Sequence, residues 1–334
     1  MLNYINFIYP REFSRVMEVT LDKLFPLAKK IIKIRLLGDK KPLKLAITPT
    51  LNCNARCRFC NIWKYHHKNE LNLDFYEKLF KTLKKDVFWL HVTGGEPFLS
   101  PILCDIIRLA TKELDNLFMI NINSNGTIPI DKLKPIIEEN PRVNFFLSFG
   151  LDGDFEFHKE RKGLTDSQIK ILKKNIELAK RWYKELKNFD YEVAYLLPTP
   201  NEQILKERYK NHSYACFPSN SDYYHNNDIK INNDKKQIIK HINKQMKELP
   251  LSIMGIVKRI SLFYSRKAFS NKILRIRYYP YYLVLDSHGK VFTDIFNYKP
   301  VGDFSKEINF SKLNLPKKVK LSPLSCDNLF YFLH

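Results

Sequence analysis

Three cysteines within eight residues constrain this chain more than any other feature. Cys53, Cys57 and Cys60 follow a C-x3-C-x2-C pattern, and Phe59 directly precedes the last of them. Thiolates are strong ligands for iron and zinc, and three on one loop can bind three irons of a cubic 4Fe-4S cluster while the fourth iron has no protein ligand. The spacing therefore indicates a metal centre with an open coordination position.

Zinc and disulfides are the two alternatives for these cysteines. His66 and His67 lie nearby, but structural zinc sites usually combine two C-x2-C pairs. Six cysteines in 334 residues are far below the density of a small disulfide-linked scaffold. Cys104, Cys216 and Cys326 stand alone in the sequence and are interpreted as small buried hydrophobic residues.

Length and composition set the class of protein. With 334 residues, 44% of them hydrophobic, the chain can form one large α/β domain and a smaller appended one. It has no run of 18 apolar residues, and its first residues do not have the basic and then apolar pattern of a signal peptide. We therefore predict a cytoplasmic location with reduced thiols.

The chain is strongly basic, with a formal net charge of +21, and the charge is unevenly distributed. Residues 29–45 contain seven basic side chains and one acidic one, and residues 230–290 contain fourteen and three. Such a field favours an anionic substrate or surface. The alternative is a lysine-rich composition whose charges are simply solvated.

Hydrophobic periodicity predicts alternating strands and helices. Strands are expected over 43–48, 87–92, 117–122, 143–149, 191–197 and 213–217. Helices are expected over 12–37 with an interruption at Pro26, and over 73–85, 101–114, 130–139 and 166–187. This alternation indicates a parallel barrel whose functional loops follow the carboxyl ends of the strands.

Polar or glycine-rich segments follow the first four predicted strands. The cysteine loop comes first, and Gly94-Gly95-Glu96-Pro97, Asn123-Ser124-Asn125-Gly126 and the stretch from Ser148 to Gly153 come next in order. Glycines allow a backbone carbonyl to approach a ligand closely, and a glutamate accepts charge-assisted hydrogen bonds. Four such segments at one edge of a sheet indicate a shared site.

These motifs resemble the radical SAM superfamily over roughly the first 220 residues. The resemblance implies a partial (β/α)6 TIM-like barrel, with Cys53, Cys57 and Cys60 as ligands of one 4Fe-4S cluster. It also implies that the open iron binds S-adenosylmethionine, which an electron from the cluster cleaves to methionine and a 5'-deoxyadenosyl radical. By the same resemblance, an adenosylmethionine pocket is formed by Gly94, Gly95, Glu96, Pro97, Ser124, Asn125, Ser148 and Asp152.

The chain departs from the family pattern after the fourth strand. Two extra residues separate Ser148 from Asp152 in the segment that resembles S-x-D-G. His158 and Lys162 match the segment that follows, with lysine where arginine is common. Lysine keeps the charge but lacks the planar fork that binds a carboxylate, and neighbouring Arg161 is either a substitute or part of a solvated loop.

The last 60 residues resemble a SPASM or twitch module that has lost its metal ligands. Residues 282–292 predict a hairpin, and Pro300-Val301-Gly302-Asp303 resembles the P-x-G-N/D step of that module. Asp294 stands where the module has a cysteine, and Cys326 is the one cysteine near the end. We therefore expect a small C-terminal α+β module of hairpin plus helix, acting as a lid, with no auxiliary cluster.

Four segments follow from these observations. They are a basic amphipathic helical segment over 1–40, the core barrel over 41–220, a helical linker region over 221–275 and the degenerate module over 276–334. The stretch 251–269 and the N-terminal helix are both basic and amphipathic. Each is suited either to a membrane surface or to packing on a core.

The preferred function is a radical SAM enzyme that abstracts hydrogen from an unidentified peptide, lipid or small molecule. The alternative is an iron-sulfur binding module that contacts nucleic acid without turnover. The G-G-E-P loop favours the enzyme, because a cluster scaffold needs no adenosylmethionine site. We expect an external electron donor, flavodoxin-like or ferredoxin-like, and no nucleic acid partner. Peripheral membrane contact stays open beside packing on the core, and no spacing selects a catalytic acid or base.

Overall fold

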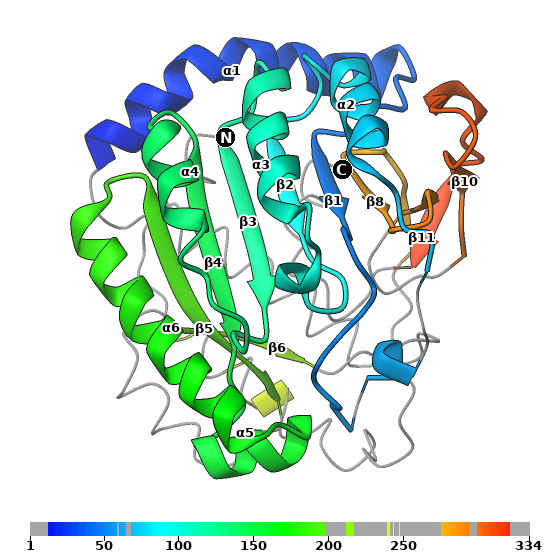
Figure 1. Ribbon diagram of the computed structural model, residues 1–334. Helices are drawn as coiled ribbons and strands as arrows, with labels where there is room; N and C mark the ends of the chain where they lie inside the picture. The colour runs from blue at the N-terminus through cyan, green and yellow to red at the C-terminus, as the bar shows by residue number, and fades with distance from the viewer. Residues whose placement is uncertain are drawn as a thin grey trace.

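The computed structural model describes residues 13–58, 60–64, 68–197, 212–216, 239–240, 243, 247, 275–293 and 299–320. These residues form a nine-stranded sheet in the order β10-β9-β8-β1-β2-β3-β4-β5-β6, and a two-stranded ribbon of β7 (Arg275–Arg277) and β11 (Lys318–Lys320). Helices cover one face of the large sheet (Figure 1).

The core of the sheet is parallel, as the sequence predicts. Each strand from β1 to β6 pairs in parallel with the next one along the chain. Their bounds are β1 (Lys44–Ile47), β2 (Trp89–Val92), β3 (Met119–Ser124), β4 (Asn144–Gly150), β5 (Phe189–Leu197) and β6 (His212–Cys216). This arrangement confirms the predicted partial barrel and brings the loops after the strands to one edge.

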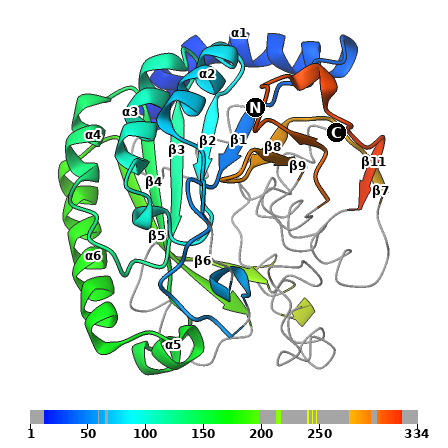
Figure 2. The same ribbon diagram turned by 45° about the vertical axis from the view of Figure 1, so that its right-hand side comes forward.

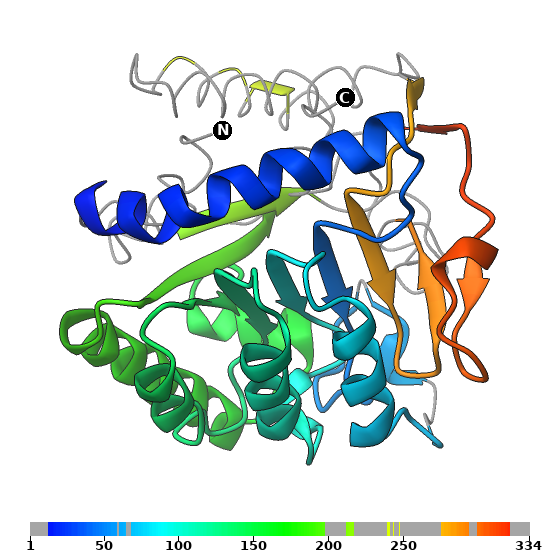
Figure 3. The same ribbon diagram turned by 90° about the horizontal axis from the view of Figure 1, so that it is seen from above.

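The helices lie outside the curved sheet (Figure 3). They are α2 (Leu73–Thr82), α3 (Leu103–Glu113), α4 (Leu133–Glu139) and α6 (Asp166–Glu185). Every second strand residue, for example Leu90, Ile120 and Leu147, is buried in one hydrophobic core together with apolar residues of these helices. The intervening residues, such as Asn121 and Ser148, belong to the opposite, concave face, because successive side chains of a strand alternate. The barrel interior is therefore partly polar.

A short helix, α5 (Phe155–Lys162), was not predicted from the sequence. The Asp154 side chain accepts a hydrogen bond from the Phe157 amide at its start, and Gly163 ends it in the left-handed region at φ 57°. The sequence FEFHKERK lacks an apolar helical period, so periodicity gives no signal for it. α5 matters because its end supports the cysteine loop.

The predicted interruption of the first helix at Pro26 is wrong. α1 (Phe13–Leu36) continues through this proline as one helix. A proline removes one main-chain hydrogen bond from a helix. The inner face of α1, however, packs against residues at the amino ends of the strands through the buried Ile34 and the partly buried Leu27 and Ile31. This packing offsets the lost bond and places α1 across that end of the barrel (Figures 1 and 3).

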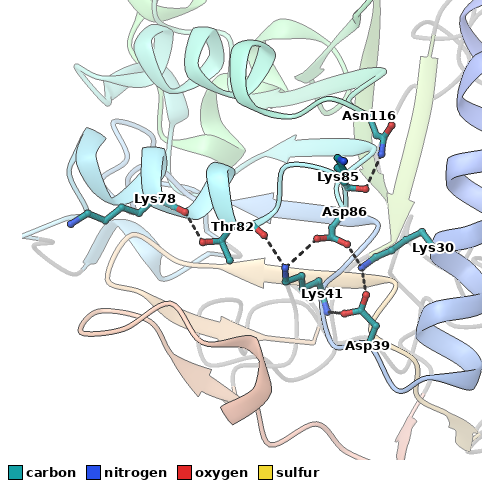
Figure 4. A network of polar contacts seen from close by, with 8 residues as sticks. All are labelled: Lys30, Asp39, Lys41, Lys78, Thr82, Lys85, Asp86 and Asn116. Carbon is teal, nitrogen blue, oxygen red and sulfur yellow. Dashed lines mark hydrogen bonds and ion pairs between the residues drawn. The ribbon is translucent and has the colours of Figure 1, made fainter.

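A buried ionic network fastens α1 to the barrel (Figure 4). The Lys30 ammonium lies 2.7 Å from Asp39 Oδ2 and 2.6 Å from Asp86 Oδ1, and its side chain is 3% exposed. Lys41 adds a second cation 3.4 Å from Asp86. Burial acts to raise the pKa of Asp39, but the hydrogen bonds from Lys30 and from the Lys41 amide outweigh it and lower that pKa.

The C-terminal hairpin extends the barrel sheet. β8 (Tyr282–Leu285) pairs antiparallel with β9 (Lys290–Phe292), as expected for the hairpin. β8 also pairs in parallel with β1, so the hairpin lies beside β1 at the edge of the sheet, not across the barrel mouth as the expected lid would (Figure 2). The short β10 (Gly302–Asp303) pairs with β9, and one helical turn, η4 (Phe310–Lys312), follows.

Several sequence predictions lie outside the described residues. They concern most of the linker region 221–275, the basic stretch 251–269, Asp294 and Cys326. The boundaries of the four segments stay predictions. In the part of the chain that the structure describes, no helix combines the length and the apolar character needed to cross a bilayer.

Replacing Lys30 tests the ionic network. Lys30→Met removes the ammonium between the Asp39 and Asp86 carboxylates, which are only partly exposed, while Lys41 stays beside Asp86. We therefore expect the free energy of unfolding to fall by about 2 kcal/mol. Lys29→Met is the matched control, because Lys29 is exposed on the same helix, and should change it by less than about 0.5 kcal/mol. Equal effects in urea denaturation would contradict the assigned role of Lys30.

Candidate functional site

The cysteine loop leaves β1 in close contact with the G-G-E-P loop. The Gly95 amide donates to Thr50 O at 3.0 Å, and the Glu96 amide donates to Asn52 O at 2.8 Å. A Cβ at Gly95 would lie 2.2 Å from Asn52 O, which no side chain permits. Gly94 has φ 130°, a conformation that favours glycine. The glycines are therefore required where two backbones meet.

The far half of the cysteine loop rests on the end of α5. The Arg56 amide donates to Lys162 O at 2.7 Å, and the Arg58 amide donates to Arg161 O at 3.1 Å. A Cβ at Gly163 would lie 2.8 Å from Arg56 Cβ, so glycine again allows the close approach. The helix that periodicity misses thus holds the loop that carries the three cysteines.

The loop after β3 joins the cysteine loop from a third side. Asn125 Nδ2 donates to Asn54 Oδ1 at 2.9 Å and lies 3.9 Å from Cys53 Sγ. Asn54 Nδ2 in turn donates to Thr127 Oγ1 at 2.8 Å. From α6, Gln168 Nε2 donates to Asn54 O at 3.2 Å. These side-chain contacts fix Cys53 relative to the loop after β3, whose residues Ser124 to Thr127 form an S-N-G-T segment.

Glu96 lies at the centre of these contacts and is fully buried. Its Oε1 accepts hydrogen bonds from Ser124 Oγ at 2.9 Å and from the Phe98 amide at 3.1 Å. Its Oε2 accepts from the Asn125 amide at 2.7 Å. Burial raises the pKa of Glu96 to about 7, while the three donated hydrogen bonds favour the ionised form. The carboxyl group therefore connects the loops after β2 and β3.

The three cysteines lie in a largely desolvated environment. Burial raises the pKa of Cys53, Cys57 and Cys60, the last to about 12. Cys53 and Cys60 each raise the pKa of Cys57 further, because nearby thiolates repel one another. The metal-free loop therefore holds neutral thiols at neutral pH, and a bound metal would displace their protons.

Lys162 is a cation close to this group of residues. Its charge lowers the pKa of all three cysteines and of Glu96, although burial outweighs it in each case. Lys162 is buried, and a Cβ at Gly150 would lie 2.6 Å from its Nζ. The ammonium group thus reaches the end of β4. The sequence motif marked Lys162, but only the fold shows that it faces the cysteines.

Arg161 lies in α5 and is buried together with His158 and Lys162, which excludes its interpretation as part of a solvated loop. The Asp152 amide donates to His158 Nδ1 at 2.9 Å, so the imidazole proton is on Nε2. Burial, with the charges of Lys162 and Arg161, lowers the pKa of His158 well below its usual value. Asp152 is fully buried and lies 3.8 Å from Arg161 Nε and 4.0 Å from Lys162 Nζ. Asp152 therefore contacts the two cations.

Ser148 is placed apart from the loops that hold the cysteines. Its hydroxyl donates to Glu192 Oε1 on β5 at 2.9 Å. In the sheet register it stands beside Asn123 of β3, on the concave side of β4. The structure therefore joins Gly95, Glu96 and the Ser124–Asn125 pair to the cysteine loop, and places Ser148 deeper in the barrel. Pro97 is buried and starts the short helix η3 (Pro97–Leu99).

The donor set fits an iron-sulfur cluster. Among the described residues, no three His, Cys, Asp or Glu side chains are grouped as ligands of one metal ion. A cubic cluster takes one thiolate per iron, so its three cysteine ligands bind three different irons and need not converge on a single ion. Three partly buried thiols on one loop, near Lys162, have the chemistry for this. His66 and His67, which zinc would need, lie outside the described residues.

Comparison with known proteins identifies the family. The sequence profile described as radical SAM superfamily matches residues 47–214, half of the chain. Molybdenum cofactor biosynthesis protein 1 of Bos taurus and of Homo sapiens are each 29% identical to this chain over 126 residues, which is 36% of the chain. The matched region covers 20% of the length of these relatives. The chain belongs to the radical SAM superfamily and is an enzyme of that class.

Solved structures support the same fold. Streptococcus suis SuiB bound to S-adenosylmethionine matches with a TM-score of 0.52 and 16% identity, over 86% of this chain and 67% of that one. SuiB bound to the precursor peptide SuiA gives a TM-score of 0.55 at 14% identity, over 90% and 70%. The protein anSMEcpe with bound AdoMet gives 0.56 at 15% identity, over 79% and 78%.

The buried carboxyl of Glu96 predicts a measurable pH dependence. Its pKa is about 7 in the folded protein against 4.5 when unperturbed, so between these values the folded state keeps a proton that the unfolded state releases. The free energy of unfolding should therefore fall as the pH rises from about 5 to about 7.5. In the metal-free Glu96→Gln variant, the free energy of unfolding measured by urea denaturation should not contain this pH-dependent decrease. Parallel pH profiles for the two proteins would refute the assignment.

Proposed function

We propose that this enzyme binds one 4Fe-4S cluster through Cys53, Cys57 and Cys60 and cleaves S-adenosylmethionine to start hydrogen abstraction from a substrate inside the barrel. The observation that carries the proposal is the Glu96 carboxyl group, which ties the G-G-E-P loop to the S-N-G-T loop. Both loops also bond directly to the cysteine loop. A cluster scaffold without an adenosylmethionine site needs no such assembly.

The cluster, when bound, supplies the electron that cleaves adenosylmethionine to methionine and a 5'-deoxyadenosyl radical. The chain's residues hold and shield it. The three thiols give up their protons to become ligands, and Lys162 offsets part of the negative charge that results. The Arg56 and Arg58 amides, bonded to the end of α5, keep the loop from moving.

The adenosylmethionine pocket is proposed at the edge formed by the loops after β2 to β4. Gly94 and Gly95 leave main-chain carbonyls uncovered for the ligand's amino group. The ionised form of Glu96 attracts that ammonium, and Ser124 and Asn125 hold Glu96 in place. The pocket as proposed also includes Pro97, Ser148 and Asp152.

Lys162 adds a charge for the carboxylate of adenosylmethionine. Its ammonium lies where a side chain at Gly150 would otherwise be, at the carboxyl end of β4. A lysine acts there as a point charge without the bidentate geometry of arginine. Asp152, buried between Arg161 and Lys162, acts by positioning these cations.

The substrate class stays open among peptides, lipids and small molecules, and an anionic group is favoured. Lys44 is buried on the concave side, 4.1 Å from the ring centre of Trp89 and 4.9 Å from that of Tyr282. Together with Lys162 it supplies positive charge inside the barrel that attracts an anionic group. One solved relative is bound to a precursor peptide, which fits a peptide substrate. A flavodoxin-like or ferredoxin-like donor in the cytoplasm would supply the electron.

Anaerobic reconstitution tests the proposal. The protein should carry about four irons and release 5'-deoxyadenosine when reduced in the presence of adenosylmethionine. Replacing Cys53, Cys57 and Cys60 together by alanine should abolish both. Cys104→Ala is the control, since Cys104 stands apart from the loop, and should change neither. Cluster formation without any 5'-deoxyadenosine would favour the binding module, and iron bound by the triple variant would overturn the ligand assignment.

A further inference from the structure

Helix α1 has a second apolar face that points away from the protein. Phe25 is 78% exposed, Ile32 54% and Leu36 77%, and Leu37 directly after the helix is 74% exposed. At 3.6 residues per turn, the three helical residues lie within about 40° of one another around the axis. They are opposite Leu27 and Ile34, which face the barrel. We call Phe25, Ile32 and Leu36 the outer stripe.

An outer stripe of this kind is unusual on a helix that already packs against a domain. Such helices normally carry polar residues on the outward face. From Phe25 to Leu36 the stripe extends about 16 Å along the axis. Three large apolar side chains gathered on one exposed surface mark an interaction site more often than a solvated one.

The charges beside the stripe are basic. Lys29 and Lys33 are exposed on its flank, and neither has an ion pair among the described residues. No acidic residue occurs between Lys23 and Leu37. Arg35, by contrast, donates to Tyr281 Oη at 2.7 Å and is held toward the barrel. The surface thus combines exposed apolar side chains with uncompensated lysines, which is the chemistry that binds anionic lipid headgroups and the acyl chains beneath them.

We propose that α1 lays its outer stripe on an anionic lipid bilayer and holds the enzyme there as a peripheral protein. The helix is preformed and fastened by Lys30 and by its inner face, so binding carries no cost of folding. α1 crosses the amino ends of the strands, whereas the cysteine loop follows the carboxyl end of β1 (Figures 1 and 3). The docked enzyme therefore presents its candidate site to the aqueous side.

Vesicle flotation of the full chain tests the proposal. The protein should float at low salt with vesicles of phosphatidylglycerol and phosphatidylcholine in equal parts, and not with phosphatidylcholine alone. Changing Phe25, Ile32 and Leu36 together to serine should abolish flotation. Leu99→Ser is the control, because Leu99 is also exposed but lies after β2, at the opposite end of the barrel.

The charge contribution is tested separately. Each lysine near an anionic surface contributes about fivefold to binding, so Lys29→Gln with Lys33→Gln should weaken it about 25-fold. Lys170→Gln with Lys174→Gln is the matched control, because these lysines are exposed with the same spacing on α6. The control pair should bind like the original protein. Equal loss in both pairs would show attraction by overall charge and would contradict a specific face.

Light scattering separates the bilayer from a second copy of the chain. If the serine variant turns a dimer into a monomer while vesicle binding is unchanged, the stripe is a protein interface and the proposal fails. Failure of the original protein to float at low salt also overturns it. Circular dichroism should give unchanged melting for all variants, since each replaces an exposed side chain. The result is independent of cluster content, so it does not depend on the proposed function.

Discussion

The buried carboxyl group of Glu96 is the interaction on which the site depends. Three segments that are distant in the sequence meet there: the cysteine loop, the G-G-E-P loop and the loop after β3. Glu96 accepts from Ser124 Oγ and from the Phe98 and Asn125 amides, and its own amide donates to Asn52 O. A charged group without water is costly unless its hydrogen bonds are complete, so these contacts hold the loops in one arrangement.

The parallel sheet explains why these loops can meet. Register pairs β1 with β2, β2 with β3 and β3 with β4, so all four carboxyl ends lie along one edge. The alternation of side chains gives helices an apolar face and leaves residues such as Asn121, Ser148 and Glu192 for the interior. The same sheet that builds the core thus provides a polar interior. β8, paired with β1, extends this sheet on its other side.

The sequence predicted the local parts of this structure well. The six parallel strands and the loops that follow them were marked by hydrophobic period and by glycines at strand ends. The α5 helix was missed because FEFHKERK has no apolar period, and its stability depends on the Asp154 cap and Gly163. The burial of Lys162 and the pairing of β8 with β1 depend on contacts between distant segments, for which a single sequence carries no signal. The predicted interruption at Pro26 was wrong because the packing of α1 on the barrel outweighs the one hydrogen bond that the proline removes.

In the proposed enzyme, one cluster with one open iron lies beside an adenosylmethionine pocket. Electron paramagnetic resonance of the reconstituted, reduced protein, recorded with and without adenosylmethionine, tests this arrangement most directly. A single reduced cluster with an open iron should give one spectrum, which changes when adenosylmethionine is added because the ligand binds that iron. A spectrum that is identical with and without adenosylmethionine, or one that contains two clusters, would contradict this arrangement.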